Sequence, residues 1–121
     1  MRRHVLGLAI CISLAALMTV ATAQRSAEAE QLLQAATHAE IVEGDLDKAI
    51  ALYRDLLSRF PNDRVVAAQA LVKLGACYEK MGRGEARTTY ERVLRDYADQ
   101  PGAVRIARAK LQELTGPAPA G

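Results

Sequence analysis

Apolar residues recur three and four positions apart along most of this chain, which is the period of an amphipathic helix. No segment shows the two-residue alternation of a half-buried strand. The pattern predicts helices over about residues 26–43, between Asp45 and Pro61, and over about 64–81, 84–97 and 102–115. The sequence therefore predicts an all-α protein.

The predicted helices are bounded by residues suited to helix ends. Short polar side chains that can cap a helix stand at Ser26, at Asp45, and at either Asn62 or Asp63. Gly44 and Gly82 follow apolar stretches, where a left-handed residue commonly ends a helix. These signals predict tight turns between successive helices.

Two segments of the chain repeat each other at an offset of 37 residues. Ala49, Tyr53, Leu56, Leu57 and Phe60 recur as Ala86, Tyr90, Val93, Leu94 and Tyr97. At these spacings the side chains form one stripe on a helix, in which the small alanine lets a neighbouring helix approach closely. The repeat predicts two similar helix pairs, over about residues 28–61 and 64–97.

A single helix pair cannot bury its own apolar stripe, so the pairs must stack and the last helix must shield the open end. We expect an α-α superhelix of two hairpins with a C-terminal capping helix over about residues 102–115. The domain then spans residues 24–115, and residues 116–121 form a tail of Gly, Pro and Ala.

The N-terminus has the three-part pattern of a secretory signal peptide. Arg2 and Arg3 precede an uncharged stretch over residues 5–20, and small residues follow at Ala21 and Ala23. We expect removal of residues 1–23 by cleavage between Ala23 and Gln24, which leaves a periplasmic or secreted protein without a membrane span. An uncleaved anchor is the alternative, although the apolar stretch is shorter than the roughly 20 residues that a spanning helix needs.

Removal of the signal changes the charge and cysteine counts. The remaining chain has 14 basic and 14 acidic residues, so it lacks the basic excess of a nucleic-acid binder. Cys77 is then the only cysteine, which excludes an internal disulfide. We interpret Cys77 as a small buried residue; the alternative is a thiol for an intermolecular bridge.

The combination of these positions resembles the tetratricopeptide repeat family. The second pair supplies the Leu-Gly, Tyr and Gly of the family's first helix and turn, followed by the Ala and aromatic of its second helix, at Leu74, Gly75, Tyr78, Gly82, Ala86 and Tyr90. The first pair matches at Gly44, Ala49, Tyr53 and Pro61 but has Thr37 and Glu40 in place of Gly and Tyr. The variant resembles repeats of bacterial envelope and periplasmic proteins.

No catalytic, metal or cofactor site is predicted. His38 is the only histidine after residue 23, and it belongs to no metal-binding pattern. Arg83, Arg87, Arg92 and Arg95 alternate with acidic residues, which is typical of a solvated helix face. The sequence favours a binding protein and not an enzyme.

The resemblance implies a concave face lined by the first helix of each pair, which holds a protein or peptide partner. On that face we expect Gln34, His38, Val72 and Glu79 to contact the partner, at positions that packing between pairs does not need. Two alternatives stay open. The module packs only on itself or on a neighbouring domain, or it is an N-terminal accessory of a separate catalytic or β-propeller domain.

Overall fold

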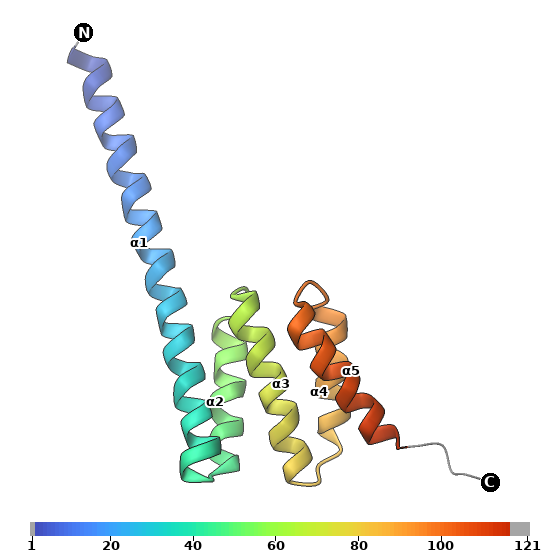
Figure 1. The fold of residues 1–121 in the computed structure, drawn as a ribbon. Coiled ribbons are helices and arrows are strands. Elements are labelled where there is room, and N and C mark those ends of the chain that lie inside the picture. The colour runs from blue at the N-terminus through green and yellow to red at the C-terminus, as the bar shows by residue number, and fades with distance from the viewer. Residues whose placement is uncertain (1, 117–121) are drawn as a thin grey trace.

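The computed structural model describes the backbone of residues 2–116 and the side chains of residues 14–116. Within this part of the chain every regular element is helical, which confirms the all-α prediction. Figure 1 shows the order: α1 (Arg2–His38), a π-helical turn η1 (Ala39–Glu43), α2 (Leu46–Arg59), α3 (Arg64–Lys80), α4 (Glu85–Asp96) and α5 (Pro101–Thr115).

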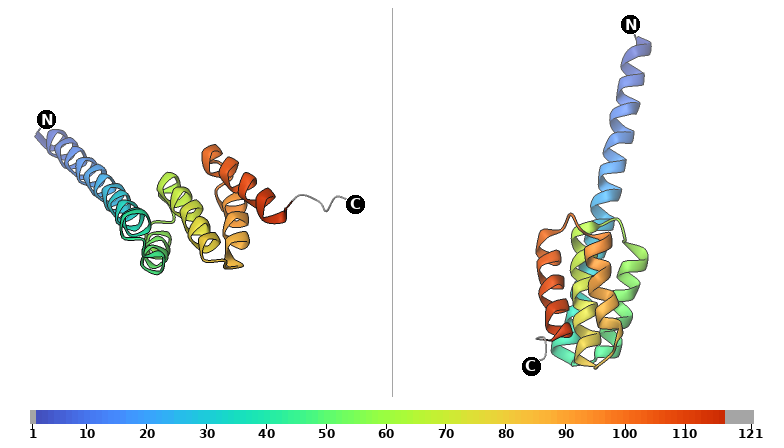
Figure 2. Two further views of the ribbon diagram at one scale, coloured as in Figure 1. Left: turned by 60° about the horizontal axis from the view of Figure 1, so that its bottom comes forward. Right: turned by 90° about the vertical axis from the view of Figure 1, so that its right-hand side faces the viewer.

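The helices form a stack in which each helix packs on the next along the chain. Figure 2 shows α1, α3 and α5 along one side of the stack and α2 and α4 along the other. We call these the first-helix face and the second-helix face. The arrangement is the predicted superhelix, and α5 occupies the place that the first helix of a third pair would take.

The turns follow the local signals in the sequence. Gly44 and Gly82 adopt φ values of 67° and 66°, the left-handed conformation that glycine reaches without steric cost. The side chain of Asp45 accepts a hydrogen bond from the backbone N–H of Lys48 at 3.0 Å, and so caps α2 as predicted.

The start of the first helix was predicted wrongly. The helix begins at Arg2 and not at Ser26, because the residues just before Ser26 include the helix formers Ala23, Gln24 and Arg25 and no glycine or proline. The Ser26 hydroxyl instead donates to the carboxylate of Asp63 at 3.3 Å. Asp63 precedes α3, yet its side chain makes no capping bond there.

The N-terminal part of α1 projects beyond the other helices (Figure 1). Leu14, Leu17, Met18 and Val20 are exposed, and among the side chains of α1 that the structure describes, from residue 14 on, the first buried one is that of Ala29. Among the residues that the structure describes, no helix is both long enough and apolar enough to cross a membrane. The predicted tail lies outside the described residues, apart from Gly116.

The core contains the repeated positions that the sequence singled out. Tyr53, Tyr90, Leu56 and Val93 are fully buried, and the small residues Ala49 and Ala86 lie beside them. Cys77 is also fully buried, and burial raises the pKa of its thiol to about 11. The thiol is therefore neutral at physiological pH, and the interpretation of Cys77 as a buried apolar residue is confirmed.

Candidate protein interface

Two partly buried polar junctions connect neighbouring first helices. The Tyr53 hydroxyl on α2 donates to Glu40 at 2.7 Å, and Lys80 at the end of α3 donates to the same carboxylate at 2.9 Å. Each junction thereby ties a second helix to the first helices before and after it.

The second junction repeats this arrangement further along the stack. The Tyr90 hydroxyl on α4 donates to Glu79 of α3 at 2.9 Å, and the ammonium group of Lys110 on α5 lies 3.5 Å from the other carboxylate oxygen of Glu79. Tyr53 and Tyr90 occupy the same position of the repeat. The repeated tyrosine therefore contributes both to the buried core and to the contact between neighbouring helices of the first-helix face.

The buried carboxylate of Glu40 remains ionised because of its partners. Its side chain is only 6% exposed. Burial on its own would raise the pKa of Glu40, but the hydrogen bonds from Tyr53 and Lys80 and the charge of Lys80 outweigh burial and hold the pKa below its ordinary value. The junction therefore contains an ionised carboxylate that accepts hydrogen bonds from side chains of two helices, α2 and α3.

A groove lies between α3 and α5 on the first-helix face. Its volume is about 420 Å³. The lining side chains are mainly apolar, with polar groups among them, and comprise Val65, Ala68, Gln69, Val72 and Lys73 from α3 with Gln100, Ala103 and Ile106 from the segment that contains α5. Val65 is 55% exposed and Ile106 is 48% exposed, so apolar surface is open to solvent here.

The four residues predicted to bind a partner do not form one site. Val72 lines the groove, although it is half-buried and packs against the core. Gln34 and His38 lie exposed one turn apart on α1, and His38 contacts Glu43 at 3.2 Å. The expectation that packing does not need Glu79 was wrong, because its carboxylate is bonded to Tyr90 and paired with Lys110.

Sequence reasoning missed the contribution of α5 to this groove. It treated the helix only as a cap, whereas Lys110 of α5 pairs with Glu79 of α3 as well as with Glu113. The available signal was Ile106, a large apolar residue between the charged residues Arg105 and Arg108.

Family models support the assignment that the repeats suggest. One model described as tetratricopeptide repeat matches residues 41–111, and a second with the same description matches residues 15–63. The chain belongs to the tetratricopeptide repeat family. The first match continues through most of α5, in agreement with the position of this helix as a further repeat element. No curated protein and no solved structure matches the chain.

Tetratricopeptide repeats fit a protein–protein interaction module, and this architecture offers a surface for that task. Each helix packs on its neighbour along the chain, and the two tyrosine–glutamate junctions connect successive helices. In the α3–α5 groove, exposed apolar side chains on two of these helices line one shared cavity.

Proposed function

We propose that this protein is a non-enzymatic protein-binding module of the bacterial cell envelope and that it holds its partner in the α3–α5 groove. The observation that carries the proposal is the exposure of Val65 and Ile106 on the two sides of that groove. Exposed apolar side chains that line a shared cavity mark a binding surface more strongly than scattered ones do.

The composition of the groove suggests what it would hold. Apolar side chains form most of its lining, while Gln69, Lys73 and Gln100 offer hydrogen-bonding groups. A short helical or extended segment of a partner protein would place one or two apolar side chains in the groove. The backbone groups of that segment would form hydrogen bonds with these polar side chains. Because two repeats offer a limited area, we expect weak to moderate affinity.

Export from the cytoplasm is the second element of the proposal. The basic start, the uncharged stretch over residues 5–20 and the small residues Ala21 and Ala23 support a cleaved signal peptide. After cleavage at Ala23, basic and acidic residues are equal in number, which favours a protein partner over nucleic acid.

The test uses two variants that differ only in which face of α5 gains a charge. Ile106→Asp places a carboxylate in the groove, whereas Ala109→Asp places one at an exposed position of the same helix that does not line the groove. Each protein, with its N-terminus at Gln24, serves as bait in an extract of a bacterial cell envelope.

We expect one protein to be captured by the wild type and by Ala109→Asp but not by Ile106→Asp. Equal capture by all three baits would show that the groove is not the binding surface. Capture only of a catalytic or β-propeller protein encoded beside this chain would instead favour the accessory-domain alternative.

A further inference from the structure

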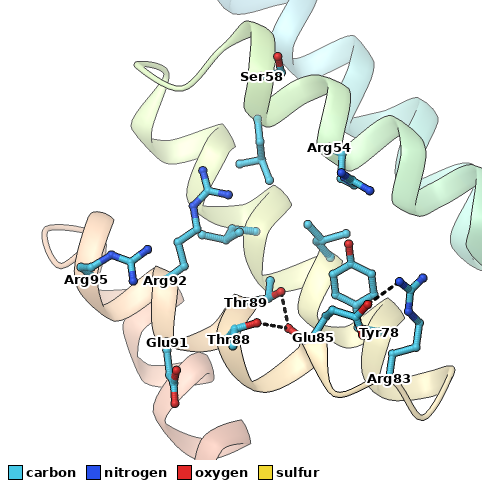
Figure 3. A pocket seen from close by; sticks show the side chains of 13 residues that line it. Arg54, Ser58, Tyr78, Arg83, Glu85, Thr88, Thr89, Glu91, Arg92 and Arg95 are labelled. Carbon is cyan, nitrogen blue, oxygen red and sulfur yellow. Dashed lines mark hydrogen bonds and ion pairs between the residues drawn. The ribbon is translucent and has the colours of Figure 1, made fainter.

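A second and larger cavity opens on the opposite side of the molecule. It lies between α2 and α4 on the second-helix face, with α3 beneath it, and its volume is about 700 Å³ (Figure 3). This volume is within the range of sites that bind small ligands or several side chains of a peptide. The proposed function does not use this cavity.

Four arginines line the cavity and only part of their charge is compensated. Arg83 is paired with Glu85 at 2.5 Å, while Arg92 and Arg95 share the single carboxylate of Asp96 at 3.3 and 3.0 Å. Arg54 makes no ion pair within the side chains that the structure describes, residues 14–116. The cavity therefore has an excess of positive charge.

The arrangement of the side chains concentrates that excess at the opening. Figure 3 shows Arg54 from α2 and Arg92 from α4 on either side of the cavity, with Glu91 directed away from both. A guanidinium group can bind a carboxylate through two parallel hydrogen bonds. Two such groups from different helices can hold two carboxylates at once.

Beside the arginines and the acidic residues, the lining combines apolar side chains with the hydroxyls of Ser58, Tyr78, Thr88 and Thr89. Leu57, Leu71 and Leu74 contribute apolar surface. The hydroxyls of Thr88 and Thr89 donate to the backbone carbonyl of Glu85 at 3.1 and 2.6 Å, so their protons are already used. The hydrogen-bond donors that stay available to a ligand are mainly those of the arginines, and the ligand that fits them supplies acceptors together with apolar groups.

We propose that this cavity binds an acidic segment of a protein partner, with carboxylates on Arg54 and Arg92 and an apolar side chain against the leucines between α2 and α4. A peptide fits better than a nucleic acid for two reasons. The leucine lining suits an aliphatic side chain, and the compensated arginines leave too short a run of positive charge to follow a phosphate backbone.

The experiment measures binding of a fluorescein-labelled peptide of alternating glutamate and leucine to the full chain at low salt. The matching peptide of glutamine and leucine is the control for charge. The test variant is R54Q/R92Q, and the control variant R105Q/R108Q removes the same charge from exposed positions on α5. Melting temperatures of all proteins are compared, so that loss of the fold is recognised.

We expect the acidic peptide to bind the wild type and R105Q/R108Q alike, and to lose about tenfold or more in affinity with R54Q/R92Q at an unchanged melting temperature. Equal losses with both double variants, or equal binding of both peptides, would overturn the proposal. Tighter binding of a single-stranded oligonucleotide that also depends on Arg54 and Arg92 would overturn the choice of a peptide.

Discussion

The ring of Tyr90 lies directly against the backbone of Gly75: a Cβ atom on Gly75 would stand only 2.7 Å from Cε1 of the ring. Tyr90 is fully buried, so the ring has no free space to retreat into. The equivalent place in the first pair is Thr37, whose hydroxyl lies 3.3 Å from that of Tyr53. The equivalent tyrosines of the two repeats thus contact their first helices differently: Tyr90 packs its ring against the backbone of α3, whereas the Tyr53 hydroxyl lies beside a side-chain hydroxyl of α1.

This contact predicts that Gly75→Ala destabilises the protein even though alanine favours helices. Overpacking against the Tyr90 ring should cost about 1–3 kcal/mol, which outweighs the gain of up to roughly 1 kcal/mol in helix propensity. Gly102→Ala is the matched control, because nothing lies within 4 Å of a Cβ atom there. Urea unfolding should show a loss for the first variant and no loss for the second; equal midpoints would contradict the contact.

Ala86 tests the register of the repeat. It is 2% exposed at the small position of the second pair, so Ala86→Leu should overpack the interface and cost about 1–3 kcal/mol. Ala51→Leu, at an exposed position of α2, adds the same atoms with little expected effect. The register would be wrong if the two variants melted at the same temperature.

Glu40 predicts a specific dependence of stability on pH. Because its pKa in the folded protein lies below the ordinary value, its carboxylate stabilises the fold above the pKa of an unfolded glutamate, about 4.3. That contribution is lost as the pH falls through the lower pKa of the folded state. Glu40→Gln should therefore be less stable than the wild type at pH 7, on the order of 1 kcal/mol, with a difference that shrinks in acid.

The measurement is the difference in free energy of unfolding between wild type and Glu40→Gln, taken by urea titration at neutral and acidic pH. Other carboxylates such as Asp99 titrate in both proteins and cancel in the difference. The exposed Glu30, changed to Gln, controls for the loss of one negative charge. A difference that stayed constant with pH would argue against an ionised Glu40 at the junction.

Much of the fold was predictable because its signals are local. Gly44, Gly82 and Asp45 set their turns through their own backbone or side-chain chemistry, and Tyr53 and Tyr90 each belong to an apolar stripe within a single helix. The start of α1 was missed because a capping residue such as Ser26 is only a permissive signal. A serine inside a run of helix formers continues the helix, and here it reaches across to Asp63.

The candidate site was less predictable because it depends on contacts between distant residues. Glu79 is bonded to Tyr90 and paired with Lys110, residues on two other helices, and nothing in its local sequence indicates this. The groove likewise combines Val72 with Ile106 from a helix that was interpreted as a cap. A position on the first helix predicts which face a residue occupies but not whether its side chain is free.

If the signal peptide is cleaved after Ala23, both the mass of the mature protein and its melting temperature can be predicted. Mass spectrometry of the protein from its native host should find an N-terminus at Gln24 or its cyclised form, whereas intact Met1 in the soluble envelope fraction would contradict export with cleavage. The described side chains before Gln24 are exposed, while Ala29 and the Ser26–Asp63 contact lie beyond it. Residues 24–121 should therefore melt close to the temperature of the full chain.

The most direct test of the protein-binding account is the footprint of the captured partner on this chain, measured by hydrogen–deuterium exchange of the free and bound protein. Partner binding should slow exchange in the segments of α3 and α5 that contain Val65, Val72 and Ile106. Slower exchange confined to the second helices, around Arg54 and Arg92, would contradict the assignment of the α3–α5 groove as the surface that holds the partner.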